Sequence, residues 1–291
     1  MSAIFKRRFR VRHYECDRYG HLNNVSYVRY MQETALDASA AAGWDTERYR
    51  AIGHQWLIRE TNIEFLQPLL WNDEVEVTSY VVDFRRVQSR RRYEFRRVSD
   101  DASVATADTN WVFLNSESGK PATIPESMVH DFAPDGLANS DRFDKFPEPP
   151  AQAAGVFRLR KRAEWRDIDT VGHLNNAAYM AYCEDASTQV GRDIGWTMQR
   201  MVDEGFALVL RRFRIQYLQP AILDDEIEIS TWVSDVKRAT ALRHYDLLRV
   251  SDKERLARAY AHIVCIDLEK QRPMRVPQHF LDAFSANIVN P

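Results

Sequence analysis

The spacing of apolar residues changes from a helical to an alternating period within the first 115 residues. In residues 24–42 apolar side chains recur every three or four positions, between an asparagine and the glycine at 43, which is typical of a bounded helix. From residue 56 onward apolar and polar residues alternate, as in half-buried strands. A charged, β-prone segment, FKRRFRVRHY, precedes the helix. The pattern predicts a strand, a long helix and four further strands.

The positions that carry these two periods define the expected core. They are Val28, Met31, Ala35 and Ala38 in the helix, and Trp56, Ile58, Ile63, Phe65, Val75, Val77, Tyr93, Phe95, Ala105, Ala107, Trp111 and Phe113 in the strands. Because the helix has no helical partner nearby in the chain, its apolar side needs the sheet as a cover. The expected fold class is therefore α+β.

The same pattern occurs a second time, displaced by 152 residues and without a gap over residues 11–125. GHLNN stands at 20–24 and again at 172–176, and RVSD stands at 97–100 and again at 249–252. The second helix is expected from Asn176, with Tyr179, Tyr182, Cys183, Ala186 and Val190 on its buried side. A repeat this long is domain-sized, so the sequence indicates a tandem duplication.

The region between the copies has a different composition. Residues 129–155 contain four prolines, several acidic residues and no sustained apolar period, which predicts a linker. The expected organisation is unit 1 at residues 1–128, the linker at 129–155 and unit 2 at 156–291.

Composition and charge exclude several classes of protein. The chain is 45% hydrophobic and 28% charged, which is typical of a water-soluble globular protein, and its net charge of −2 favours neither nucleic acid nor a membrane as a partner. We expect no membrane span and no secretory signal, and the three cysteines match neither a disulfide framework nor a zinc site. A reduced, cytoplasmic setting is the expectation.

Motifs for several reaction types are also missing from the sequence. G-x-S-x-G, the nucleophile motif of serine α/β-hydrolases, does not occur, nor do G-x-G-x-x-G or a P-loop. The sequence therefore predicts no nucleotide cofactor and no resident metal.

A polar cluster surrounds each GHLNN. An aspartate precedes it by three residues (Asp17, Asp169) and a tyrosine follows it by three (Tyr27, Tyr179). DRYGHLNNVSY and DTVGHLNNAAY resemble the Asp-x-x-x-His-(Val/Leu)-Asn-Asn-x-x-Tyr signature of hot-dog-fold thioesterases, in particular the acyl-CoA and 4-hydroxybenzoyl-CoA thioesterase group. The resemblance covers nearly all of both copies.

This resemblance implies a fold and an arrangement of the copies. Each copy is expected to wrap an antiparallel sheet of about five strands around one helix, and the two copies to form a pseudo-dimer, since bare sheet edges are rare in proteins. Association of the whole chain into a homo-oligomer is a further possibility. Plant acyl-ACP thioesterases, which are also tandem hot dogs, carry an asparagine two positions before the histidine. Tyr19 and Val171 stand there in this chain, which favours the acyl-CoA branch.

The cluster has the residue types that thioester hydrolysis needs. An aspartate just before a helix is kept ionised by the positive end of the helix dipole, and it can activate water or attack the carbonyl itself. The free N–H groups of the first helical turn, near Asn24 and Asn176, can hold the oxyanion. In the family that this chain resembles, the aspartate and the helix-start amide hold these roles, and His21 and His173 are expected to orient the loop or the water.

Most of these residues also have a purely structural interpretation. An aspartate or asparagine before a helix is often only an N-cap. This alternative applies to Asp17 and Asp169, and also to Asn23 and Asn175. We consider Asn23 and Asn175 as substrate-binding residues too. Tyr27 and Tyr179 lie on the helix, where a core tyrosine is the alternative to a substrate contact. The occurrence of the full cluster in both copies favours chemistry. Cys16 has no counterpart in the second copy, which argues against a thiol nucleophile.

A second candidate site is a basic run, FRRVQSRRRYEFRR at 84–97, with a thinner match at 236–249. Clustered arginines bind phosphates well, so the run predicts contacts to the phosphates of coenzyme A. The alternative is a solvated strand face. The candidate residues of this site are Arg86, Arg91, Arg238 and Arg243.

The sequence thus predicts a thioesterase that converts an acyl-CoA to a free acid and coenzyme A. Two alternatives stay open: a non-catalytic module that binds acyl thioesters on the same fold, which would need the pocket but not Asp17 or Asp169, and an acyl-ACP thioesterase.

Overall fold

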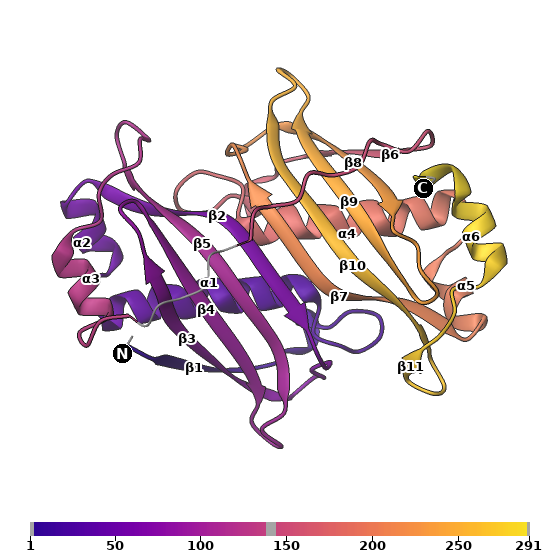
Figure 1. Cartoon of the computed structure of the whole chain (residues 1–291), viewed down its shortest axis with the longest axis horizontal. Helices are drawn as coiled ribbons and strands as arrows, with labels where there is room; N and C mark the ends of the chain where they lie inside the picture. Colours follow the sequence, from indigo (N-terminus) through magenta and orange to yellow (C-terminus); the bar gives the residue numbers. More distant parts are fainter. Residues whose placement is uncertain (1–2, 138–143, 290–291) are drawn as a thin grey trace. The chain divides into compact units, whose positions relative to one another are not determined.

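The computed structural model describes residues 3–137 and 144–289 and divides the chain into two compact units, Met1–Lys145 and Phe146–Pro291. Figure 1 shows that one long helix lies behind the strands in each unit. The elements of unit 1 are β1 (Phe5–Arg10), α1 (Asn24–Ala41), α2 (Thr46–Ala51), β2 (His54–Phe65), β3 (Glu74–Phe84), β4 (Gln88–Arg97), β5 (Ser103–Asn115) and α3 (Glu126–Phe132). Those of unit 2 are β6 (Phe157–Arg162), α4 (Asn176–Asp193), α5 (Met198–Asp203), β7 (Phe206–Tyr217), β8 (Glu226–Ser234), β9 (Thr240–Arg249), β10 (Arg255–Asp267), β11 (Arg272–Pro273) and α6 (Gln278–Phe284).

The strands of both units pair antiparallel in the same order. In the described part of unit 1 the order is β1-β3-β4-β5-β2, and in unit 2 it is β6-β8-β9-β10-β7, with the short β11 on β10. The predicted succession of one strand, one long helix and four strands is confirmed in each copy.

The long helices begin where the sequence predicts. Asn23 and Asn175 are the N-caps, and their side-chain oxygens accept hydrogen bonds from the N–H groups of Val25 and Ala177, each at 2.9 Å. The predicted apolar positions of both helices are buried, among them Met31 at 2% and Cys183 at 0% exposure. Each helix therefore packs its apolar side against the sheet of its own unit, as an α+β unit requires.

Four short helices were not predicted, and they close the cores. In unit 1, Met128 and Phe132 of α3 pack with Trp44 and Phe113, and in unit 2 Phe280 and Phe284 of α6 pack with Trp196. The helices α2, α3, α5 and α6 have only six or seven residues, which is too short for a helical period to show in the sequence.

Both ends of the predicted linker belong to the units. Phe132 is buried in unit 1, and Phe146 and Ala153 are buried in unit 2. Apolar side chains within this polar stretch thus pack onto their neighbouring units, and the linker bounds of 129–155 stay a prediction. Residues 138–143 of the predicted linker lie outside the described residues. No helix within residues 3–137 and 144–289 is long and apolar enough to cross a membrane.

Candidate active site

The aspartate of each copy closes a tight loop just before the long helix. Asp17 donates its backbone N–H to the carbonyl of His21 at 2.7 Å, and its side-chain Oδ1 accepts from the N–H groups of Tyr19 and His21 at 2.8 and 3.1 Å. Asp169 makes the same three hydrogen bonds: its N–H donates to the carbonyl of His173 at 2.8 Å, and its Oδ1 accepts from the N–H groups of Val171 and His173 at 2.9 and 3.3 Å. The glycine within each loop, Gly20 or Gly172, has a positive φ, which an L side chain rarely adopts.

These hydrogen bonds use only one oxygen of each carboxylate. Among the described residues, Oδ2 of Asp17 and of Asp169 has no hydrogen-bond or ion-pair partner. Both side chains are half-buried. Neither aspartate is the N-cap, since Asn23 and Asn175 fill that role. Each carboxylate is thus fixed through one oxygen while the other remains available to a reactant.

The start of the helix follows this loop directly. Asn24 and Asn176 are the first residues of α1 and α4, a position whose N–H has no acceptor within the helix. The next two N–H groups of α4 already bond to Asn175, one to its side chain and one to its carbonyl. The N–H of Asn176 is therefore a helix-start donor to which Asn175 does not bond.

His21 and His173 lie within the aspartate loops. Their backbone groups make the loop hydrogen bonds described above, and their side chains are half-buried. No described residue bonds to either imidazole ring. The structure thus brings Asp, His and the helix start together in each unit, as the sequence predicts.

The tyrosines of the motif lie in the core instead. Tyr27 is 2% and Tyr179 is 3% exposed, and the hydroxyl of Tyr179 accepts from the N–H of Ala221 at 3.0 Å. Burial raises the pKa of Tyr179 to about 12 and that of Tyr27 above its usual range as well. These contacts favour the core alternative over substrate binding, because the rings fill the space between helix and sheet.

Two further pairs brace the loop and were missed in the sequence. The hydroxyl of Tyr30 donates to Glu15, and that of Tyr182 donates to Asp167, each at 2.8 Å. The carbonyls of Glu15 and Asp167 accept from the N–H groups of Asn23 and Asn175. Each pair ties the helix to the segment that leads into the loop. Their signal was present, since an acid and a tyrosine recur at matching positions of both copies.

The four candidate arginines fall into two classes. Arg86 and Arg238 are exposed in the turns after β3 and β8, and no described residue pairs with their guanidinium groups. Arg91 and Arg243 are only 8% and 4% exposed. The interpretation of a solvated strand face is therefore wrong for Arg91 and Arg243, which point into the cores, where coenzyme A phosphates would lose their water.

Within one unit the structure does not bring Arg86 and Arg238 to the aspartate loops. The loop of Asp17 contacts the segment before β3, since Leu22 donates to the carbonyl of Leu69. Arg86 lies beyond the other end of β3, whose 11 residues span about 35 Å. Contacts of Arg86 and Arg238 to coenzyme A stay a prediction.

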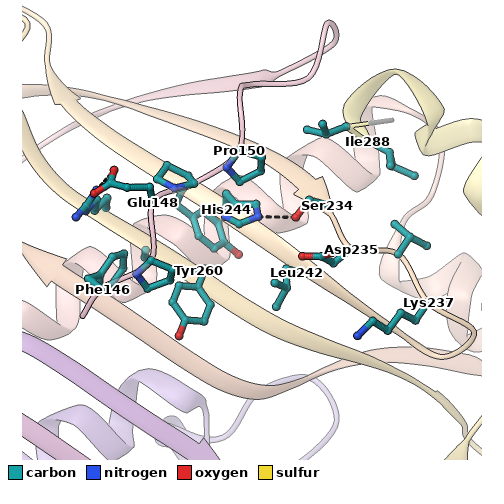
Figure 2. Close-up of a pocket in the computed structure, with 17 residues that line it drawn as sticks. Phe146, Glu148, Pro150, Ser234, Asp235, Lys237, Leu242, His244, Tyr260 and Ile288 are labelled. Carbon is teal, nitrogen blue, oxygen red and sulfur yellow. Dashed lines mark hydrogen bonds and ion pairs between the residues drawn. The ribbon is translucent and has the colours of Figure 1, made fainter. Parts of the chain in front are cut away.

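Unit 2 also contains a cavity of about 740 Å³ on its sheet, covered by the proline-rich segment 146–150 (Figure 2). None of the predicted site residues lines it. The buried His244 points toward Ser234 in this cavity, and their side chains lie 2.8 Å apart. Burial lowers the pKa of His244 to about 4, with a smaller lowering effect from Arg243 and an opposing one from Asp235. In the described ranges, no three His, Cys, Asp or Glu side chains gather where they could hold a metal ion.

This histidine gives a testable pH dependence of stability. Its pKa in the unfolded chain is near 6.5, so between pH 6.5 and 4 the unfolded state binds the proton and the folded state does not. Stability from this group is fully present above pH 6.5 and is lost as the pH falls, by about 3 kcal/mol at pH 4. We expect His244→Gln to lose less unfolding free energy than the wild type over this range. Chemical denaturation at several pH values measures the unfolding free energy of both proteins. If the unfolding free energies of the wild type and the variant fell in parallel with pH, His244 would not be the source of the pH dependence.

Comparisons with known proteins identify the class to which this fold and site belong. The family model of the thioesterase-like superfamily matches residues 11–132 and again residues 163–284, so the chain belongs to this superfamily and carries two copies of its domain. Thioester hydrolysis is the activity that the comparisons support.

Individual relatives divide between two substrate types. The acyl-CoA thioesterase YbgC of Haemophilus influenzae is 33% identical over 129 residues, which cover 44% of this chain and 93% of that protein. The dodecanoyl-[acyl-carrier-protein] hydrolase of Umbellularia californica is 21% identical over 269 residues, 89% of this chain and 67% of its own length. A solved structure of the 12:0-ACP thioesterase from Umbellularia californica covers 90% of this chain and 94% of its own, with a TM-score of 0.72 and 19% identity. That likeness confirms the tandem hot-dog fold.

Proposed function

We propose that the chain hydrolyses acyl-CoA thioesters, with Asp17 and Asp169 as the carboxylates that activate water or attack the thioester carbonyl. The observation that carries this proposal is the duplicated loop, in which one carboxylate oxygen is fixed by two N–H groups and the other has no partner among the described residues. A carboxylate held in this way is oriented before the substrate arrives, which is the condition for efficient general-base or nucleophilic catalysis.

In the general-base route, the free oxygen of the aspartate takes a proton from water while the water oxygen bonds to the carbonyl carbon. The negative charge that develops on the carbonyl oxygen is stabilised by the N–H at the start of the helix, the position of Asn24 or Asn176. The carbon–sulfur bond then breaks, and the proton passes to the thiolate of coenzyme A. His21 or His173 orients the water in the same loop.

Acyl-ACP is the second candidate substrate. The dodecanoyl-[acyl-carrier-protein] hydrolase of Umbellularia californica matches both units of this chain, whereas the acyl-CoA thioesterase YbgC of Haemophilus influenzae matches one unit. We favour acyl-CoA because the sequence has Tyr19 and Val171 where plant acyl-ACP thioesterases carry an asparagine, and because an acyl-CoA thioesterase is 33% identical to this chain over 129 residues.

The test is a matched panel of acyl groups, each offered on coenzyme A and on acyl carrier protein, with release of the free thiol monitored. We expect kcat/KM to be higher for coenzyme A thioesters. A higher value for the carrier-protein thioesters would reverse the substrate assignment, and no thiol release from either carrier would leave a binding module.

A double variant tests whether Arg86 and Arg238 bind the nucleotide of coenzyme A. We expect Arg86→Met with Arg238→Met to raise KM for acyl-CoA and to leave KM for a short pantetheine thioester, which has no nucleotide, unchanged.

A further inference from the structure

Among the buried arginines of the described residues, one occupies the same position of the sheet in both units. Arg91 on β4 and Arg243 on β9 point to the inner side of the sheet and are 8% and 4% exposed. Nη1 of Arg91 donates to the hydroxyl of Ser79 at 3.0 Å, and Nη1 of Arg243 donates to that of Thr231 at 3.4 Å. The guanidinium carbons lie 5.6 and 5.7 Å from the ring centres of Phe132 and Phe284.

Neither guanidinium has an acidic partner among the described residues. No carboxylate lies within 4.0 Å of either one, and the ionisable groups that act on them most strongly are tyrosines: Tyr93 and Tyr49 for Arg91, and Tyr245 for Arg243. Burial lowers the pKa of both arginines, yet an arginine in a protein keeps its proton. Both units therefore hold a buried positive charge that no described acid neutralises.

The hydroxyl and phenylalanine contacts of each guanidinium offset the cost of burying its charge only in part. The burial of one ion costs more free energy than a single cation–π contact returns. One hydrogen bond to a neutral hydroxyl also offsets only a small part of that cost. A buried arginine with this set of partners is better matched by a ligand that brings a negative charge.

A cavity adjoins the arginine of unit 2. It has a volume of about 40 Å³, and apart from Arg243 its walls are mainly apolar, with Phe280 and Phe284 of α6 and Cys265 of β10 among them. A single water needs about 10–15 Å³ measured in this way. The cavity thus accommodates a group of a few heavy atoms, such as a carboxylate, directly at the guanidinium.

The position of Arg243 along the unit is suited to the far end of an acyl chain. Tyr245, on the same face of β9, shares a hydrogen bond with Ser187 of α4 at 2.6 Å. Ser187 lies 11 residues beyond Asn176, which is about 16 Å along the helix from the proposed oxyanion donor. A medium-length acyl chain lying against the helix covers this distance.

We propose that Arg243, and Arg91 at the matching place in unit 1, each bind a carboxylate in the interior of their unit. The carboxylate has two possible sources: the distal end of the acyl group, which would make these arginines specificity determinants for ω-carboxyacyl thioesters, or a free dicarboxylate. The first source depends on the thioesterase function proposed above, and the second does not.

Two measurements on the full chain test the site. The first compares kcat/KM for pairs of acyl-CoAs of equal length that end in a methyl group or in a carboxylate. The second follows the Tm with rising adipate and with hexanamide as the neutral control. Both are made on the wild type, on Arg91→Met, Arg243→Met and the double variant, and on Arg272→Met as an exposed control on β11. Methionine keeps most of the side-chain volume and removes the charge.

We expect kcat/KM of the wild type and of Arg272→Met to be higher for the carboxylate-ended substrate than for the methyl-ended one. In the double variant, kcat/KM for the carboxylate-ended substrate should fall by about 10- to 100-fold, while kcat/KM for the methyl-ended substrate stays unchanged. If adipate alone raises the Tm of the wild type and not of the double variant, the ligand is a free carboxylate, even in a protein that hydrolyses no thioester. If the wild type neither favours the carboxylate-ended substrate nor responds to adipate, the arginines are structural and the site does not exist. A wild-type preference that survives in the soluble, folded variants would equally overturn it.

Discussion

Replacement of Asp17 and Asp169 together by asparagine is expected to lower kcat/KM for thioester hydrolysis by about 10²- to 10⁴-fold, the range that a positioned general base contributes. Asparagine keeps the shape of the side chain, and its amide oxygen still accepts from the loop N–H groups that bond to Oδ1 in each copy. The loop should therefore persist while the base or nucleophile is lost. Initial rates of thiol release, with unfolding curves alongside, measure both effects.

The single variants show how the two copies share the work. If both sites are active, Asp17→Asn and Asp169→Asn each retain part of the wild-type rate. If one single variant is as slow as the double variant, the other copy is structural. Asp37→Asn is the matched control, because Asp37 is an exposed aspartate of α1 whose carboxylate pairs with Arg7. Full activity in the double variant would refute the mechanism.

The secondary structure that encloses the core could be predicted because it follows from two periods. The helix predicted from Asn24 to Ala42 is observed from Asn24 to Ala41, since both of its ends carry boundary residues. The six- and seven-residue helices could not be predicted, because a segment of fewer than two turns shows no period and is held by tertiary packing. The packing of Phe132 and Phe146 onto the units could not be predicted for a related reason: a single phenylalanine in a polar stretch does not reveal what it contacts.

The candidate site could be predicted where the motif is local and missed where it depends on packing. The aspartate, the histidine and the helix start are within eight residues of each other, so the chain itself brings them together. The bond of Tyr30 to Glu15 joins residues that are 15 apart, and only the folded unit shows it. The burial of Arg91 was visible in principle, because Arg91 alternates in step with Tyr93 and Phe95 on one face of a strand. The many charged residues of the segment 84–97 favoured an exposed strand face instead of a buried arginine.

The tyrosines of the motif provide the second large effect, on stability rather than on substrate affinity. Tyr179 packs against Tyr217 with ring centres 5.4 Å apart, and Tyr27 packs against Phe65 and Phe95 at 5.2 and 5.4 Å. Truncation of such a buried aromatic ring leaves a cavity, so Tyr27→Ala and Tyr179→Ala should each lower the unfolding free energy by about 3–5 kcal/mol. Tyr179→Phe should cost about 1–3 kcal/mol, because the N–H of Ala221 is left without its acceptor.

Chemical denaturation measures these differences, and steady-state kinetics on the folded variants separates the two interpretations. The carbonyl of Ala221 accepts from the N–H of Leu174, the residue after His173, so the tyrosine hydroxyl supports the aspartate loop through one intervening residue. Tyr179→Phe is therefore expected to lower kcat by a few-fold and to leave KM nearly unchanged. A substrate-binding tyrosine would behave in the opposite way: KM would rise several-fold in Tyr179→Phe, with no loss of unfolding free energy.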